Sequence, residues 1–428
     1  MLLFSGIENN ISDEKNFQII IQFSFLCLLF FLLNNSSLYT KTKEEIKSLH
    51  LRKIINKLKM YSKYRQPKYY LFSDFFGNKY CSDINAFVLF EYYLKNNNND
   101  VFYIINNDSE LYQNLKKENR TKNLILINGK INILDKLFNY ILNAKIIIQS
   151  YVLLDFHYIV NNVTYLKYIY INHGITYFKN HFVSSELNYL NEDKRNIITS
   201  SPYEYNIYIN NFNYSDKYIY KAGLARYEMY RSIKKGNKEK NCILASFTYR
   251  SYNNSYYEKS LYKSNLMKLL NDNSLIKFLK SYNIDLIYIP HHYELYLHKK
   301  FNSTKYIYAK IFGQNDLTSY IQKCSLLITD FSSISFAFMF NYKPILFYLL
   351  DYNETIDVPE IKWMNPNNEL FFGNSFLNKD SLVKKIKYYV RRKFKISKTL
   401  KNNYQSVFYY RKNIRKRLCE IINKIVNT

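Results

Sequence analysis

The chain has 428 residues, with 61 Lys and Arg against 34 Asp and Glu, so its formal net charge is +27. Hydrophobic residues make up 47% of the chain and aromatic residues 18%, which supplies enough apolar material for a core and excludes wholesale disorder. The positive charge favours anionic partners such as phosphates, nucleic acid or a membrane surface. The heavy use of Lys, Asn, Ile and Tyr is also what an AT-rich genome produces.

The first predicted element is an uncharged apolar segment over 17–33, which is short for a helix that crosses a bilayer. Basic residues follow it more densely than they precede it, so the positive-inside rule places the rest of the chain on the cytoplasmic face of the cell membrane. We therefore expect a membrane anchor, spanning or interfacial. The alternative is a helix that is buried within the folded protein.

A basic segment over 40–66 has a helical pattern, and the pattern then changes to short apolar runs separated by polar turns. Such runs are typical of buried parallel strands, and helical stretches at 83–95 and 131–142 alternate with them. The predicted strands of this half are 69–72, 101–105, 123–127, 144–150 and 168–172.

A polar segment, 234–240, indicates a linker, after which the alternation starts again. The predicted strands of this second half are 241–247, 285–290, 305–310, 325–330 and 344–349, and the predicted helices are 260–270, 317–323 and 382–391. We expect an α/β fold of two Rossmann-like domains facing across a cleft. The expected parts are 1–66 (anchor and basic helix), 67–232, 241–383 and a basic helical tail, 384–428. The basic tail is either a solvated helical face or a surface for anionic lipid.

Ligands of open α/β sheets bind beyond the carboxyl ends of the strands, so polar residues directly after strands are candidates for a site. His173 and Gly174 follow the 168–172 strand, with Thr176 close behind. The glycine permits a tight turn and close approach of a substrate, and the imidazole is a candidate general base. A capped turn whose histidine binds the backbone is the alternative.

Three further candidates also lie at strand ends or in turns. Gly223 and Arg226 form only a weak phosphate signal, and a surface arginine is the safer interpretation. Thr248 and Arg250 follow the 241–247 strand, where a hydroxyl and a guanidinium suit an anionic oxygen.

The pair His291 and His292 follows the 285–290 strand, and it favours phosphate binding or acid–base chemistry over zinc because no cysteine or histidine ligand spacing accompanies it. We therefore expect no metal site. The five scattered cysteines likewise give no disulfide framework.

The last candidate is Asp330 with Ser332 and Ser333, which separate a strand from an apolar helix start. Hydroxyls and backbone N–H groups at a helix N-terminus bind anions. A plain N-cap is the alternative, and both interpretations can hold together.

Taken in order, INHGIT, GLAR, FTYR, IPHH and LLITDFSSISFAF with KPILFYLLD resemble the CDP-glycerol glycerophosphotransferases, the family of teichoic-acid and capsule polyol-phosphate transferases. The resemblance also includes 71–95 and covers roughly 68–425. It implies a glycosyltransferase-B type fold and transfer of a polyol phosphate from CDP-glycerol or CDP-ribitol to a hydroxyl of a lipid-linked or surface glycan, with release of CMP and without a cofactor.

By the same resemblance, His173 corresponds to the catalytic base and His291 to a second essential histidine, with His292 beside it as an open alternative. Arg250, Ser332 and Ser333 correspond to donor-phosphate binding, supported by Thr248 and Asp330. Competing hypotheses are a glycosyltransferase that uses sugar nucleotides, a non-catalytic scaffold and a nucleic-acid-binding protein. The last is disfavoured because no nucleic-acid-binding motif is present.

Overall fold

The computed structural model describes residues 36–74, 84–96, 99–127, 133–151, 154–178, 187–230, 241–248, 250, 260–291, 304–310, 317–355 and 367–428. The chain divides into two compact units, 1–63 and 64–428. The first contains helix α2 (Ser36–Tyr61), which confirms the predicted basic helix. None of the helices in the ranges above is both long and apolar enough to cross a bilayer, and the predicted anchor at 17–33 lies outside those ranges.

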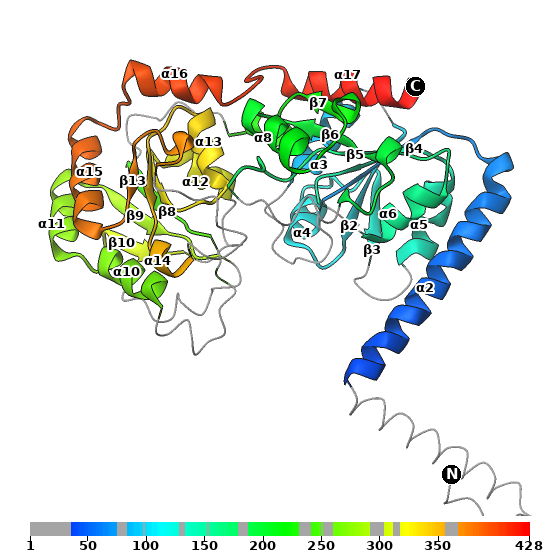
Figure 1. Cartoon of the computed structure of the whole chain (residues 1–428), viewed down its shortest axis with the longest axis horizontal. Coiled ribbons are helices and arrows are strands. Elements are labelled where there is room, and N and C mark those ends of the chain that lie inside the picture. The colour runs from blue at the N-terminus through cyan, green and yellow to red at the C-terminus, as the bar shows by residue number, and fades with distance from the viewer. Residues whose placement is uncertain are drawn as a thin grey trace, which may run out of the picture. The chain divides into compact units, whose positions relative to one another are not determined.

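The second unit holds two parallel sheets, which confirms the α/β class (Figure 1). The first sheet has seven strands in the order β3-β2-β1-β4-β5-β6-β7, and all neighbours in it are parallel. Its strands are β1 (Tyr69–Ser73), β2 (Val101–Asn106), β3 (Leu124–Ile127), β4 (Ala144–Gln149), β5 (Lys167–Tyr170), β6 (Asn196–Thr199) and β7 (Ile219–Lys221). The sequence pattern predicts the first five. The sequence analysis does not predict β6, which has four residues, or β7, which has three.

The second sheet has six parallel strands in the order β10-β9-β8-β11-β12-β13. Its strands are β8 (Cys242–Ala245), β9 (Asp285–Tyr288), β10 (Ile307–Ala309), β11 (Leu326–Thr329), β12 (Ile345–Tyr348) and β13 (Ser375–Phe376). The first five confirm predicted strands, and β13 has two residues and no pattern of its own. The central strands β8, β11 and β12 are buried at every position, as expected for strands covered on both faces.

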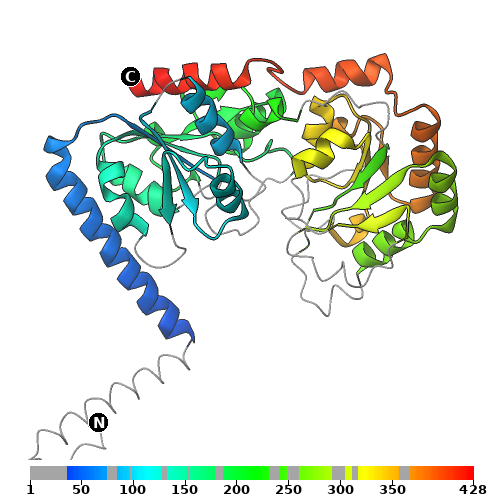
Figure 2. The same ribbon diagram turned by 180° about the vertical axis from the view of Figure 1, so that it is seen from behind.

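Helices connect the strands of both sheets (Figures 1 and 2). The helices between strands of the first sheet are α3 (Asn85–Lys95), α4 (Glu110–Lys117), α5 (Ile133–Leu142), α6 (Leu154–Asn162) and α8 (Pro202–Asn206). The helices of the second half are α10 (Leu261–Leu270), α11 (Asn273–Tyr282), α12 (Leu317–Lys323), α13 (Ile334–Phe340), α14 (Tyr352–Thr355) and α15 (Lys379–Arg391). Side-chain oxygens of Ser109, Ser260, Asp272 and Asn378 cap four of these helices by accepting backbone N–H bonds.

The last two helices, α16 (Lys398–Ser406) and α17 (Ile414–Asn427), pack on different sheets. Helix α16 contacts α13, whereas α17 contacts α3 and β5 of the first sheet. Helix α17 can do this because Ile414, Leu418, Ile422 and Ile425 form a buried apolar stripe at helical spacing. The C-terminal residues therefore belong to the folded body, and some of their basic side chains bind it too, since Arg415 pairs with Glu228 and Arg411 donates to the Phe340 carbonyl.

In each sheet the chain reverses its direction of winding at one point, between β1 and β4 in the first sheet and between β8 and β11 in the second. Loops on the two sides of such a point diverge, which leaves room for a ligand at the carboxyl ends of the strands. Thr248 and Arg250 follow β8, and Asp330 follows β11. The topology thus gathers two of the predicted candidates at the switch point of the second sheet.

Candidate active site

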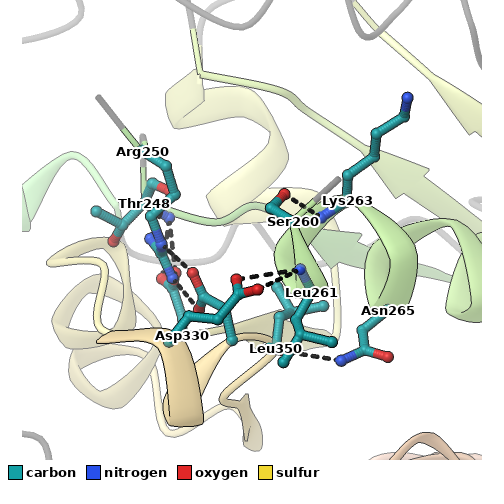
Figure 3. Close-up of polar contacts among 10 residues, drawn as sticks. Thr248, Arg250, Ser260, Leu261, Lys263, Asn265, Asp330 and Leu350 are labelled. Carbon is teal, nitrogen blue, oxygen red and sulfur yellow. Dashed lines mark hydrogen bonds and ion pairs between the residues drawn. The ribbon is translucent and has the colours of Figure 1, made fainter. Parts of the chain in front are cut away.

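A buried ion cluster occupies the switch point of the second sheet (Figure 3). The guanidinium of Arg250 donates to Asp351 through Nε (2.7 Å) and one terminal nitrogen (2.8 Å), and it pairs with Asp330 at 2.9 Å. Its other terminal nitrogen donates to the Thr248 carbonyl at 2.8 Å. Burial alone lowers the pKa of Arg250, but the two carboxylates outweigh burial and raise it above its usual value. These contacts bind Arg250 to the protein itself, where the sequence predicts contact with a donor phosphate.

Thr248 lies at the edge of this ion cluster and, unlike the charged groups of the cluster, has a side-chain polar atom without a partner among the described residues. Its backbone N–H donates to both Asp330 oxygens, at 2.9 and 3.2 Å. Its hydroxyl is buried, with the residue only 5% exposed, and finds no hydrogen-bond partner in the part of the chain that the structure describes. A buried hydroxyl without a partner costs about 1–3 kcal/mol, so the Thr248 hydroxyl is a candidate for hydrogen bonding to a ligand.

The start of α10 lies close to the ion cluster in Figure 3. Ser260 caps this helix by accepting from the backbone N–H of Lys263 at 3.3 Å. The Leu261 N–H donates to both oxygens of Glu354 at 3.1 Å. A carboxylate of the protein therefore already accepts from this helix start.

The loop after β5 carries His173 and is shaped by Asn172. Asn172 has a positive φ of 59°, a conformation that asparagine tolerates better than most residues. Its Oδ1 accepts from the backbone N–H of His173 at 2.9 Å, and Nδ1 of His173 lies 3.1 Å from the Tyr170 hydroxyl. Nδ1 of this imidazole is therefore in contact with a buried hydroxyl group.

Glu204 ties this loop to the end of β6. Its fully buried carboxyl accepts from the backbone N–H groups of Thr176 (2.8 Å) and Ser200 (2.7 Å) and from the Asn172 amide (2.7 Å). Burial raises the pKa of Glu204 to about 8, against the opposing effect of the two backbone donors. Thr176, predicted as a supporting residue, is itself buried and acts through this carboxyl.

Arg226 and Asn85 hold the same loop from a second direction. A terminal nitrogen of Arg226 donates to the His173 carbonyl, and the Asn85 amide donates to the Asn172 carbonyl at 2.8 Å. Asn85 also accepts from the Arg226 backbone N–H at 3.1 Å. Gly223, in contrast, lies against α17, since a Cβ there would come within 3.1 Å of Ile414. The GLAR segment therefore supports the histidine loop and the C-terminal helix.

The histidine loop touches the loop after β11. A Cβ at Gly174 would lie 3.2 Å from Oγ and 3.3 Å from Cβ of Ser333, so glycine permits this close approach. Ser333 is exposed and precedes α13, but its side chain makes no capping hydrogen bond, while Ser332 is half-buried. The plain N-cap alternative thus does not account for the Ser333 hydroxyl.

An aromatic contact reinforces this meeting of the two loops. Phe178, four residues after Gly174, stacks on Phe336 of α13 with ring centroids 5.3 Å apart, and on Phe371 at 5.6 Å. Phe178 is also 5.9 Å from Phe347 of β12. The segment that follows His173 is therefore part of the apolar core beside the second sheet.

The two remaining predicted histidines lie beyond β9. His291 is half-buried and follows β9, the neighbour of β8, while His292 lies outside the described residues. Across the described ranges, no three His, Cys, Asp or Glu side chains gather as a metal site requires.

A buried carboxyl, that of Asp74, lies at the switch point of the first sheet. Asp74, which follows β1, accepts from the backbone N–H groups of Ala86 and Phe87, both at 2.9 Å, and from the Tyr103 hydroxyl at 2.9 Å. Burial raises the pKa of this carboxyl to about 6. Asp74 therefore fixes the start of α3, from which Asn85 reaches the histidine loop.

The sequence analysis misses Tyr170, Asn172, Glu204 and Asp351, and each for the same reason. Each acts on a residue that the sequence does predict, through contacts that only the folded chain creates. An asparagine directly before a His-Gly pair is the one local signal, since it suits a positive φ.

The sequence matches a family model described as CDP-glycerol:poly(glycerophosphate) glycerophosphotransferase over residues 56–424. It is also 27% identical over 266 residues to the minor teichoic acid biosynthesis protein GgaB of Bacillus subtilis strain 168. That match covers 56% of this chain and 27% of the relative, so the chain spans only about a quarter of GgaB's length.

Solved structures with the same fold include the wall teichoic acid polymerase TagF. A histidine variant of TagF superposes with a TM-score of 0.62 at 15% identity, covering 91% of this chain and 97% of the other. A second TagF structure, of a variant soaked with CDPG, has a TM-score of 0.59 at 16% identity, with coverage of 92% and 98%. MnaA of S. aureus with UDP gives 0.52 at 12%, covering 84% and 97%.

The structural likenesses show the fold, and the family match extends over most of the chain, including every candidate loop. This protein belongs to the CDP-glycerol:poly(glycerophosphate) glycerophosphotransferase family.

Proposed function

We propose that this protein transfers glycerol phosphate, or a related polyol phosphate, from a CDP-activated donor to a hydroxyl of a lipid-linked or cell-surface glycan, releasing CMP during the synthesis of a teichoic-acid-like or capsular polymer. Family membership supports the donor class and the reaction type. The roles of GgaB in minor teichoic acid biosynthesis and of TagF as a wall teichoic acid polymerase support the kind of product.

One observation carries the proposal, the contact between Gly174 and Ser333. It brings a candidate base and candidate phosphate ligands together from two separate sheets. Phosphoryl transfer to an alcohol requires alignment, charge stabilisation and removal of a proton, and little else from the protein. The approach of Gly174 to Ser333 supports a site in which the histidine loop and the loop after β11 both contribute to this reaction.

In the proposed step, the acceptor oxygen forms a bond to the phosphorus that carries the polyol. The bond from that phosphorus to the CMP oxygen breaks, and the acceptor proton passes to His173. Ser332, Ser333 and Thr248 offer hydroxyl donors to the phosphate oxygens, and His291 faces the pyrophosphate. Arg250 and Asp330 act as the rigid support of this side, because their charges are already paired with each other and with Asp351.

We place the enzyme at the cytoplasmic face of the cell membrane. The apolar segment 17–33 supports this location, and so do the basic side chains of α15 to α17. Binding to vesicles is expected to rise with the fraction of anionic lipid and to fall with salt. Equal partition into neutral and anionic vesicles would contradict a basic membrane surface.

The decisive experiment follows CMP release from CDP-glycerol, CDP-ribitol and UDP- or GDP-sugars in the presence of lipid-linked acceptors. We expect CMP release from a CDP-polyol and none from His173→Ala, whose unfolding transition should match that of the unaltered protein. Turnover of a UDP- or GDP-sugar instead would favour a glycosyltransferase on the same fold. CMP release by His173→Ala at the original rate would falsify the assignment of the base.

A further inference from the structure

We propose that Glu204, Asn172 and Tyr170 form a hydrogen-bond chain that holds His173 in the tautomer with its proton on Nδ1, which leaves Nε2 as the atom that accepts a proton. This inference rests on the proposed function for its consequence in catalysis, but the tautomer itself can be observed without any substrate. Glu204, Asn172 and Tyr170 are positioning residues, since they act through the imidazole.

The first step is the orientation of the Asn172 amide, which is fixed from both sides. Its Nδ2 donates to Glu204 at 2.7 Å and to Thr176 Oγ1 at 3.2 Å. Its Oδ1 accepts from the backbone N–H groups of His173 at 2.9 Å and Gly174 at 3.4 Å. Reversing the amide would place its NH₂ donors against two backbone N–H groups, so Oδ1 must face the histidine.

The second step concerns the single proton of the Tyr170 hydroxyl. The hydroxyl oxygen lies 3.3 Å from Asn172 Oδ1 and 3.1 Å from His173 Nδ1. Oδ1 can only accept, so the contact between these two oxygens is a hydrogen bond only when the tyrosine donates its proton to the asparagine. The tyrosine oxygen can then bind Nδ1 only by accepting a proton from it. The imidazole thus carries its proton on Nδ1 when neutral.

The third step is burial, which makes this chain rigid. Tyr170 is 1% exposed, and both Asn172 and Glu204 are fully buried. Glu204 also accepts from two backbone N–H groups, so its oxygens are fixed in place. Breaking a link would leave a buried polar group without a partner, which is unfavourable. The preference for one tautomer is therefore built in before any substrate arrives.

The same strand supplies a matched control. The hydroxyl of Tyr168, two residues before Tyr170 on β5, lies 3.1 Å from Nε2 of His157, and both residues are buried. Tyr168→Phe removes a buried tyrosine hydroxyl that faces a histidine other than His173. It should leave both the His173 tautomer and turnover unchanged.

The test is ¹⁵N NMR of protein labelled at histidine, at pH 8, where an ordinary imidazole with a pKa of about 6.5 is neutral. The His173 signals are assigned by their loss in His173→Ala. We expect a protonated Nδ1 and an unprotonated Nε2 in the unaltered protein. In Tyr170→Phe we expect a shift toward the Nε2–H form. We also expect kcat to fall at least about tenfold, but by no more than the roughly 10²–10⁴-fold that a general base contributes in total, with the donor KM unchanged.

Glu204→Gln is a second variant, because its amide cannot accept all three bonds and should shift the tautomer likewise. An Nε2–H form in the unaltered protein, or an unchanged His173 spectrum in Tyr170→Phe, overturns the inference. So does an equal shift in Tyr168→Phe. If the tautomer behaves as expected but His173→Ala still turns over, the proposed base fails while the hydrogen-bond chain stands.

Discussion

Replacing Arg250 with methionine tests whether the ion cluster is the structural support of the second sheet. The substitution keeps much of the side-chain volume but leaves two carboxylates without their cation, and Asp330 is 0% and Asp351 1% exposed. Removing one partner of a buried ion pair costs about 3–5 kcal/mol. Because domains are stable by only about 5–15 kcal/mol, this loss takes a large part of the total.

The measurement is urea unfolding of the full chain followed by far-UV circular dichroism. Lys379→Met is the matched control in the same half, since Lys379 pairs with Asp272 near the surface, its side chain 29% exposed. That pair should contribute less than about 1 kcal/mol. Adding Asp351→Asn to Arg250→Met should recover part of the loss, because it removes one unpaired charge. Equal destabilisation by Arg250→Met and Lys379→Met would refute the reasoning.

Two further predictions separate binding from folding. Thr248→Val should leave the stability of the ligand-free protein unchanged or higher, because it removes a buried hydroxyl without a partner, yet it should weaken CDP-glycerol binding about tenfold. The control, Thr329→Val, breaks a 2.6 Å hydrogen bond to the Ser246 carbonyl and should instead destabilise the fold. Identical behaviour of the two variants would contradict this prediction. Burial raises the pKa of Glu204 to about 8, above the unfolded value of about 4.3. Between these two values the folded state keeps a proton that the unfolded chain has lost. The free energy of unfolding should therefore fall as pH rises from about 4.5 to 8, by up to about 1.4 kcal/mol per pH unit. Denaturation at several pH values should show this slope in the unaltered protein and a smaller one in Glu204→Gln, and parallel slopes would count against it.

The strands of this fold could be predicted from the sequence because burial on both faces gives an unbroken apolar run. The run over 144–150 is such a case, and it corresponds to β4 (Ala144–Gln149). Strands β7 and β13 have three and two residues, and they exist only because a longer neighbour offers backbone partners. No local pattern marks strands of that length.

The candidate site divides in the same way. His173, Thr248 and Asp330 could be predicted because they follow strands with clear apolar runs, and ligands of open α/β sheets bind beyond the carboxyl ends of the strands. The partners of Arg250 could not, since Asp351 lies 101 residues away and meets it only through the pairing of β8, β11 and β12. Glu204 likewise has no local signal, because its role depends on the packing of α8 beside the histidine loop.

The stacking of Phe178 on Phe336 and Phe371 affects how the catalytic groups come together. The proposed base belongs by sequence to the first sheet, yet the segment after it is embedded in the apolar core of the other. The stacking therefore anchors the loop of the proposed base against α13, the helix that begins directly after Ser333. Loss of these rings should disturb both loops together, because one aromatic cluster supports them both.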